Sequence, residues 1–403
     1  MTSGMHYGWP SPSLPQLEKV VNSTLTLNHD EGSWMAVMPL IGALIGALIA
    51  ATIVDILGRK RTIIITCFPF FAAWIMIAFS KSVIVLYVAR FIAGVADGWA
   101  FTAVPMYIGE IAEPKIRALI SSIVPILALL TFIWMPESPY YLVMKSHHED
   151  AKKNLQILRG REDVEIELNR VSKAVNAQTQ NSGKFLDLFI TKSNRKAVFI
   201  MMALRGAQQL SGTTAITFYT QLIFKEAGDD ISSELATIIY FSVQVLLTVL
   251  CSSIVDRAGR RPLLILSLSG SALALFLEGT YFLIKTRTGI DTSSFSYLPV
   301  ISLIGFVIFF SIGMQSIPIL MLGELFPANV KAFALCLADM YFCVMATIVS
   351  KFFQIVKDSF GMDVPFYVFT TKGKSLEEIQ HFLGGKTGKE SHDEKVEKFE
   401  VVA

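Results

Sequence analysis

The sequence predicts an all-α membrane protein built from two related halves. Of its 403 residues, 53% are hydrophobic and 17% are charged, whereas soluble proteins carry about 25% charged residues. Apolar runs of about 20 residues, the length that a helix needs to cross a bilayer, recur along the chain. A pattern of glycine and charged residues in the first part returns in the second, which indicates an internal duplication.

Eight apolar runs are predicted to span the membrane. They cover about residues 34–54, 62–80, 83–108, 196–225, 234–255, 262–284, 297–322 and 332–356. A ninth run, residues 118–135, is short and contains Pro125, so it either crosses the bilayer or dips in and returns. We therefore expect about 8–9 transmembrane helices.

Changes in composition divide the chain into four segments. Residues 1–135 form an N-terminal transmembrane half and residues 196–371 a C-terminal one. Between them, residues 136–195 turn charged with the periodicity of amphipathic helices, and residues 372–403 form a polar tail. Lys and Arg near span ends are retained in the cytosol. The linker is therefore predicted to be cytosolic, and Asn22 begins a glycosylation sequon on the outer side.

Several functional classes are excluded by composition and spacing. The net charge is +2 and no basic tract with interleaved aromatics occurs, which argues against nucleic-acid binding. The four cysteines lie scattered in apolar runs, without the spacing of a disulfide framework or a metal site. No nucleophile elbow or phosphate-binding loop is present, and the N-terminus lacks the pattern of a signal peptide. We expect neither an enzyme nor a bound metal or cofactor.

The duplicated pattern consists of two charge boxes that recur in the same order. Asp55–Arg61 reads DILGRKR and Asp256–Pro262 reads DRAGRRP, while a Gly-Glu pair with a cation seven residues later occurs once in each half. We expect these charges to pair at cytosolic helix ends and to form a latch; the alternative is that the basic residues are only topology signals. The predicted latch residues are Asp55, Arg59, Lys60, Arg61, Glu110, Arg117, Asp256, Arg260, Arg261, Glu324 and Lys331.

Seven segments extend this order along most of the chain: DILGRKR, RFIAGVADGWAFTAVPMYIGEIAEPKIRA, PESPYYL, QQLSGTTAITFY, DRAGRRPLL, IPILMLGELFP and TKGKSLEEIQ. Together they resemble the successive signatures of the sugar porter family of the major facilitator superfamily. GWPSPSLPQL and TKGKSLEEI are similar to insect facilitated trehalose or hexose transporters within it. The resemblance implies a helical bundle of two halves with a sugar site between them.

The resemblance assigns sugar contacts to the seventh and eighth helices. Amide side chains can both donate to and accept from sugar hydroxyls in an apolar bundle. The implied substrate-binding residues are Gln208, Gln209, Thr214, Tyr219 and Gln244. Ser211 and Gly212 allow local unwinding beside them, and Phe218 and Tyr219 stand where the family has an aromatic gate. The alternative for each amide is an interhelical hydrogen bond without a substrate role.

The chain departs from the family in length and at several site positions. The family has twelve spans, and the first, the fifth and sixth, and the twelfth are incomplete or missing here. Ile319 replaces the family's tenth-helix Trp, and Phe342-Cys343 replaces an Asn-Trp pair. Three carboxylates, Asp97, Glu278 and Asp339, lie inside apolar runs, where they require partners.

The resemblance implies a multi-pass plasma-membrane protein that carries out facilitated diffusion of a hexose, or of a disaccharide such as trehalose, by alternating access. Its partners would be the sugar and the lipid bilayer. One alternative is a non-transporting truncated paralogue that senses sugar or associates with, and modulates, a complete transporter. Another is an ion-coupled symporter, for which Asp97 is the residue to test.

Overall fold

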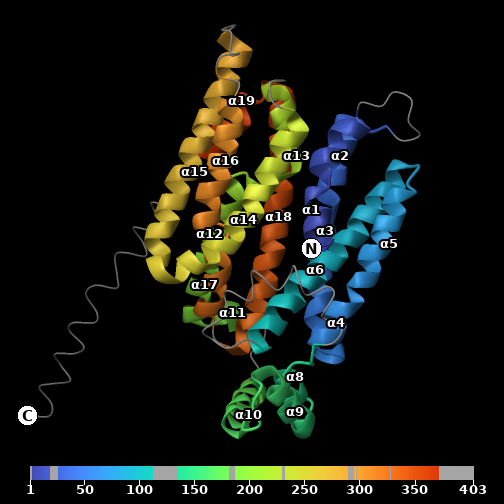
Figure 1. Cartoon of the computed structure of the whole chain (residues 1–403), viewed down its shortest axis with the longest axis vertical. Coiled ribbons are helices and arrows are strands. Elements are labelled where there is room, and N and C mark those ends of the chain that lie inside the picture. Colours follow the sequence, from blue (N-terminus) through green and yellow to red (C-terminus); the bar gives the residue numbers. More distant parts are fainter. Residues whose placement is uncertain are drawn as a thin grey trace, which may run out of the picture.

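The computed structural model describes residues 2–18, 26–111, 135–180, 187–228, 232–288, 295, 297–326 and 328–371. All regular elements of these residues are helices, which confirms the predicted all-α class. Figure 1 shows two groups of long helices side by side, with a smaller group of helices below them. Arg117 and Asn22, residues 118–134 of the doubtful ninth run and the predicted tail lie outside the described residues.

The N-terminal half begins with two short helices and continues with long ones. Its helices are α1 (Thr2–Gly8), α2 (Pro10–Leu17), α3 (His29–Leu57), α4 (Arg59–Ile65), α5 (Cys67–Ala78) and α6 (Val83–Ile111). Asn28 caps α3. Its side-chain oxygen Oδ1 accepts a hydrogen bond from the backbone N–H of His29, and its backbone N–H donates to the side-chain carboxylate of Glu31. At the other end, Gly58 has a φ of +92°, a conformation that favours glycine and lets α3 turn directly into α4.

Helices α3 and α6 pack backbone to backbone through small residues. A Cβ atom added at Gly42 would lie 2.2 Å from the carbonyl oxygen of Phe91, and one added at Gly94 would lie 2.1 Å from that of Pro39. Gly46 and Gly98 repeat this close approach one turn further on. Gly42 and Gly46 thus form a GxxxG packing face on α3. Its counterpart on α6 is a second GxxxG pair, Gly94 and Gly98.

The part of the predicted linker up to residue 180 contains three helices. These are α8 (Pro139–Met144), α9 (His148–Arg159) and α10 (Glu165–Gln180). Val143, Ala151, Val171 and Val175 form their shared buried core. The three helices lie together beyond the ends of α3 and α6 (Figure 1).

The C-terminal half repeats the pattern of long helices and ends in a short one. Its helices are α11 (Asp187–Ile190), α12 (Lys192–Leu210), α13 (Thr213–Ala227), α14 (Ser233–Ala258), α15 (Arg260–Leu283), a π-helical turn (Ile284–Thr288), α16 (Leu298–Ile312), α17 (Ile317–Leu325), α18 (Ala328–Phe360) and α19 (Asp363–Thr371). α19 has nine residues, fewer than the roughly 20 that a span requires. It nevertheless packs into the half, because the ring of Phe366 stacks on Phe282 and that of Phe369 on Phe353.

Six helical segments, counted only over residues whose side chains are described, are long and apolar enough to cross a bilayer. They are His29–Ala50, Arg59–Ala78, Val83–Val104, Arg260–Thr288, Leu298–Met321 and Phe333–Phe360. The predicted span at 196–225 is instead divided, because the helix breaks at Ser211 and Gly212, where Gly212 has a φ of +78°. The run at 234–255 lies in α14, of which Ser233–Thr248 forms a shorter apolar helix.

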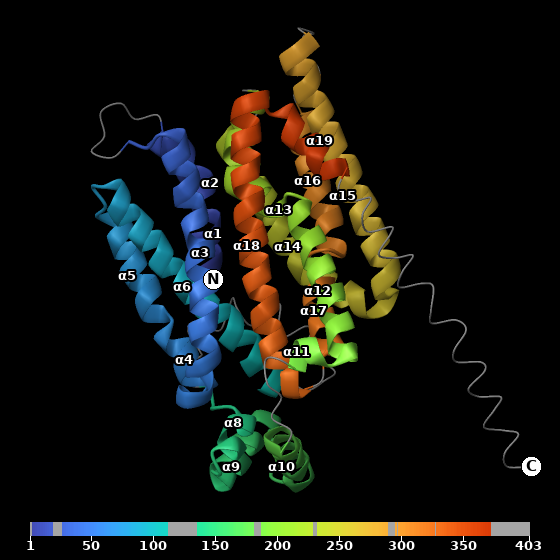
Figure 2. The ribbon, with the colours of Figure 1, turned by 180° about the vertical axis from the view of Figure 1, so that it is seen from behind.

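The two halves meet along five helices. α3 packs along α18, and α1 and α2 pack against α13. Figures 1 and 2, seen from opposite sides, both show α18 facing the N-terminal half. One buried apolar cluster combines Leu14, Met35 and Leu86 of the first half with Ile216 and Phe218 of the second. The bundle therefore has a continuous core between its halves.

Candidate functional site

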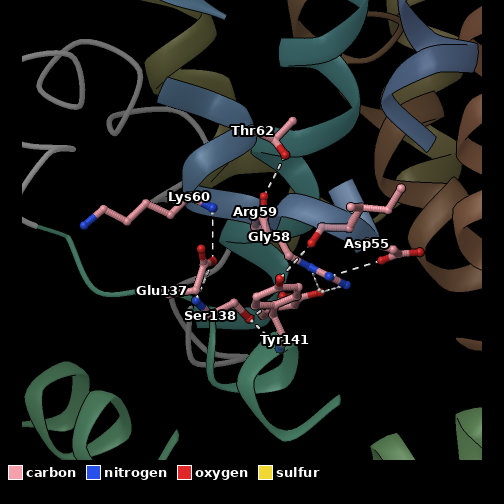
Figure 3. Close-up of polar contacts among 10 residues, drawn as sticks. Asp55, Gly58, Arg59, Lys60, Thr62, Glu137, Ser138 and Tyr141 are labelled. Atoms are coloured by element: carbon pink, nitrogen blue, oxygen red, sulfur yellow. Dashed lines mark hydrogen bonds and ion pairs between the residues drawn. The ribbon is translucent and has the colours of Figure 1, made fainter. Parts of the chain in front are cut away.

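The charged residues of the first charge box contact one another at the predicted cytosolic end of the N-terminal half (Figure 3). Arg59 Nη1 lies 3.1 Å from Asp55 Oδ1, and Arg59 Nη2 lies 3.0 Å from Glu110 Oε1. Arg59 and Glu110 are largely buried, whereas the Asp55 carboxylate is exposed. The pair thus joins the turn between α3 and α4 to the end of α6.

The same box holds the start of the linker. The Ser138 hydroxyl donates to the Glu110 carboxylate, and the backbone amide of Lys60 donates to Glu137 Oε1 at 3.0 Å. The guanidinium carbon of Arg59 lies 5.4 Å from the centre of the Tyr141 ring. Burial raises the pKa of Glu110, and the positive charge of Arg59 opposes that rise.

Only some of the remaining predicted latch residues have side chains that the structure describes. Arg61 is exposed on α4, and Arg260 and Arg261 are exposed at the start of α15. Arg117 lies outside the described residues, as do the side chains of Asp256, Glu324 and Lys331. Within the described side chains, the box that Arg59 forms joins elements of the N-terminal half and the linker. Its role in holding the two halves together stays a prediction.

The glutamine pair lies at the end of α12, directly before the helix break. Gln209 is fully buried, and its Oε1 accepts a hydrogen bond from the Thr214 hydroxyl at 2.7 Å across the break. Its Nε2 has no hydrogen-bond partner among the described residues. Gln208 is also buried, and its Oε1 accepts from Arg205 Nη1 at 3.1 Å. The structure therefore brings Gln208, Gln209 and Thr214 together.

Aromatic rings on α13 follow the glutamine pair. The Phe218 ring lies 5.2 Å from that of Tyr7 on α1, so it makes a contact between the two halves. Tyr219 stacks on Phe353 of α18 at 5.3 Å. The hydroxyl group of Tyr219 is buried and has no hydrogen-bond partner in the described chain. Since an unpaired buried hydroxyl is unfavourable by about 1–3 kcal/mol, such groups mark places where a polar ligand would be stabilised.

Gln244 lies on α14 and is half-buried, one helical turn before Thr248. Its backbone carbonyl accepts from the Thr248 hydroxyl at 2.8 Å, and Thr248 Oγ1 accepts from Gln315 Nε2 at 3.2 Å. Gln315 lies in the bend between α16 and α17, and its backbone carbonyl oxygen accepts a hydrogen bond from Gln208 Nε2. A chain of polar groups thus links α12 to α14 by way of this bend.

Two buried cations were missed in the sequence. Arg205 Nη2 pairs with Asp339 Oδ1 of α18 at 3.2 Å, and Arg90 Nη1 donates to the carbonyl of His6 at 2.6 Å. The sequence marks Asp339 as a carboxylate inside an apolar run, and Arg90 and Arg205 lie in apolar runs as well. A basic residue inside an apolar run is the signal that would have found both. Glu278 is fully buried on α15.

The polar groups of this region are suited to hydrogen bonding with a hydroxylated solute. They are amides, hydroxyls and a neutralised ion pair. Among the described residues, no cluster of three or more His, Cys, Asp or Glu side chains could hold a metal ion.

Comparisons with known proteins identify the family. The model of the family described as "Sugar (and other) transporter" matches residues 3–124 and 118–381. The facilitated trehalose transporter Tret1 of Polypedilum vanderplanki is 32% identical over 435 residues, which cover 96% of this chain and 86% of that protein. Tret1 of Apis mellifera ligustica is 31% identical over 432 residues, with 95% and 85% covered. Because these alignments exceed the 403 residues of the chain, the relatives contain residues without a counterpart here.

Solved structures show the same fold. The proton:xylose symporter XylE of the major facilitator superfamily, bound to 6-bromo-6-deoxy-D-glucose, superposes with a TM-score of 0.75 at 20% identity, covering 94% of this chain and 93% of that one. An inward-open XylE from E. coli gives a TM-score of 0.69 over the same shares. The matched family model, the similarity to sugar transporters over most of the chain and the shared fold together show that this chain belongs to the sugar porter family of the major facilitator superfamily.

Proposed function

We propose that this protein carries a sugar across the plasma membrane by facilitated diffusion, and that the sugar is a hexose or a disaccharide such as trehalose. The observation that carries the proposal is the unpartnered amide of Gln209, fully buried where the helix breaks between α12 and α13. An amide NH₂ in an apolar bundle needs an acceptor, and sugar oxygens are acceptors of the right kind. Relatives that match over most of the chain are facilitated trehalose transporters.

The proposed mechanism is alternating access, in which the two halves rock about the sugar site. Contacts between α2 and α13 and between α3 and α18 hold the halves together. Tyr7 and Phe218 close the space between α1 and α13. Separation of these contacts would expose Gln208 and Gln209 to the outside.

Uptake of labelled glucose and labelled trehalose tests this function in cells that express the full chain. We expect uptake above that of vector-only cells once surface abundance is measured and used for normalisation. Gln209→Ala should raise KM about 5–10-fold, because one hydrogen bond to the sugar is lost. The matched control is Gln354→Ala, since Gln354 is also buried but bonds Asp358 within its own helix.

Two outcomes decide against the proposal. Uptake equal to the vector control, despite delivery to the surface, contradicts transport. An unchanged KM in Gln209→Ala removes that amide from the sugar site. Facilitated diffusion also requires uptake that does not depend on an external proton gradient; uptake that depends on such a gradient and loses this dependence in Asp97→Asn would instead indicate a symporter.

A further inference from the structure

Both glutamines of the candidate site have their carbonyl oxygens occupied by other side chains. Gln208 Oε1 accepts from Arg205 Nη1 at 3.1 Å, and Gln209 Oε1 accepts from the Thr214 hydroxyl at 2.7 Å. Each NH₂ group has two N–H donors, and at least one of them is unused in each glutamine. Gln209 Nε2 has no partner within the described chain, and Gln208 Nε2 lies 3.4 Å from the carbonyl of Gln315, beyond the usual range of about 2.7–3.2 Å.

Arg205 determines the orientation of the Gln208 amide. A guanidinium has five N–H donors and no acceptor, so a side chain that bonds it must present an oxygen. A rotation of the Gln208 amide by 180° would place its NH₂ group against the N–H groups of Arg205. The carbonyl of Gln208 is therefore committed to Arg205, and its NH₂ group is directed away from that residue.

Arg205 is itself held in place from the next helix. Its Nη2 lies 3.2 Å from Asp339 Oδ1 on α18, and its guanidinium carbon lies 5.3 Å from the centre of the Phe342 ring. The residue is 5% exposed, and its Nε has no hydrogen-bond partner among the described residues. Asp339 neutralises the charge and so allows a guanidinium to remain beside the glutamine pair.

We propose that Arg205, held by Asp339, is a positioning residue that makes the pair Gln208–Gln209 a donor-only contact, selective for sugar oxygens that accept hydrogen bonds. The inference rests on the proposed function, because it takes the pair to be the sugar site. On the second glutamine, the Thr214 hydroxyl occupies the carbonyl of Gln209, although a hydroxyl, unlike a guanidinium, can also accept a hydrogen bond. A sugar position that faces the pair is then recognised by its lone pairs and not by its hydroxyl proton.

Sugar analogues distinguish these two kinds of recognition. Replacing a hydroxyl by fluorine keeps an acceptor and removes the donor, whereas replacing it by hydrogen removes both. At the position that faces the pair, a donor-only contact accepts the fluoro analogue and rejects the deoxy analogue. A contact that used the amide carbonyl would reject both, because neither analogue can donate to it.

The test uses the purified full chain in detergent, with ligand binding measured as a concentration-dependent rise in melting temperature. The ligands are D-glucose, trehalose, and the monodeoxy and monodeoxyfluoro glucoses. The position that faces the pair is the one at which Gln208→Ala abolishes the preference for the hydroxyl over hydrogen. There we expect the fluoro analogue to bind within about twofold of glucose and the deoxy analogue to bind about fivefold more weakly.

Two variants should relax this pattern. Arg205→Met combined with Asp339→Leu removes the ion pair without leaving an unpaired charge, and Thr214→Val removes the hydroxyl that occupies Gln209. Each frees one carbonyl to accept from a sugar hydroxyl, so the fluoro analogue should become about fivefold weaker than glucose. Arg205→Lys keeps a donor-only cation and should keep the parent pattern. Thr220→Val is the matched control, since the Thr220 hydroxyl bonds the carbonyl of Ile216 within its own helix.

The outcomes separate the inference from the function on which it rests. If neither glucose nor trehalose raises the melting temperature, the proposed function fails and the inference fails with it. If sugars bind but the fluoro and deoxy analogues are rejected equally by the parent chain, only the donor-only contact is overturned. The same holds if Thr214→Val and Arg205→Met/Asp339→Leu bind sugar with the analogue preferences of the parent.

Discussion

Lys351 of α18 reaches across to the first turn of α3, where its Nζ lies 3.0 Å from Asp30 Oδ1 and 2.6 Å from Ser33 Oγ. The same ammonium group lies 4.1 Å from the centre of the Trp34 ring. Lys351 is largely buried, whereas the Asp30 carboxylate is exposed. One side chain of the C-terminal half thus makes polar and cation–π contacts with the N-terminal half near its predicted outer end.

Lys351→Met should loosen the outer contact between the halves. Exposed ion pairs contribute about 0.2–1 kcal/mol, and a cation–π contact adds a similar amount. A cysteine introduced by Ser11→Cys reports the separation of the two halves. Ser11 lies on α2 and is buried against α13, where its Oγ accepts a hydrogen bond from the backbone N–H of Gln221. We expect Lys351→Met to increase the rate at which an impermeant thiol reagent labels this cysteine, by about 2–5-fold.

Lys357→Met is the control for this experiment. Lys357 stands on the same helix and is as well buried, but it pairs with Glu226 and Asp358 inside the C-terminal half. Equal labelling rates in both lysine variants would show that Lys351 does not hold the halves together. The parent chain without the added cysteine corrects for the native thiols.

The pair Arg59–Glu110 should matter far more for stability than Arg59–Asp55. Removal of the carboxylate in Glu110→Ala leaves a buried guanidinium with one exposed partner, which destabilises a protein by about 3–5 kcal/mol in comparable sites. Asp55→Asn should change stability by less than about 1 kcal/mol, because the Asp55 carboxylate is 61% exposed. Thermal unfolding in detergent and surface abundance measure both effects; similar losses in the two variants would contradict this ranking.

Local signals in the sequence predict the fold class, the helical linker and the helix break, because apolar periodicity and glycine conformation act within a few residues. They do not predict which side chains meet. Arg205 and Asp339 are 134 residues apart, and Arg59 and Glu110 are 51 apart. The duplicated boxes indicated that charges would pair, but the structure shows that Ser138 and Glu137 of the linker complete the first box. The orientation of the Gln208 amide likewise depends on Arg205, for which the sequence offered only a charge in an apolar run.

Gly94→Ala should prevent α3 and α6 from packing. The added Cβ atom would lie 2.1 Å from the carbonyl oxygen of Pro39 and 2.6 Å from its Cα, and backbone atoms cannot move aside as a side chain can. We expect a loss of at least about 1–3 kcal/mol, seen as a lower melting temperature and poor surface delivery. Gly305→Ala on α16 is the control, because its Cβ would meet Ala274 at an ordinary 4.0 Å. Normal stability of Gly94→Ala would show that the helices can separate without penalty.

The packing of α9 against α10 should weaken in acid. Glu167 accepts from Arg159 Nη2 at 2.6 Å, and Arg161 Nη2 lies 3.4 Å away. Hydrogen bonds from Arg159 lower the pKa of Glu167 in the folded state. A carboxylate with a lowered pKa stabilises the fold above its unfolded pKa, about 4.3, and this stabilisation is lost as the pH falls through the folded value. Because Glu167 is partly exposed to solvent, we expect a contribution below about 1 kcal/mol.

Hydrogen-exchange protection factors of the α9 and α10 amides, corrected for intrinsic exchange at each pH, measure this effect. Protection should decline below about pH 4.3 in the parent chain. In Glu167→Gln it should be lower at neutral pH, by less than about fivefold, and should change less with acid. Glu149→Gln, an exposed carboxylate at the start of α9, should retain the parent profile. Should Glu167→Gln titrate like the parent, the acid sensitivity must come from another group, because the neutral side chain has no proton to gain in this range.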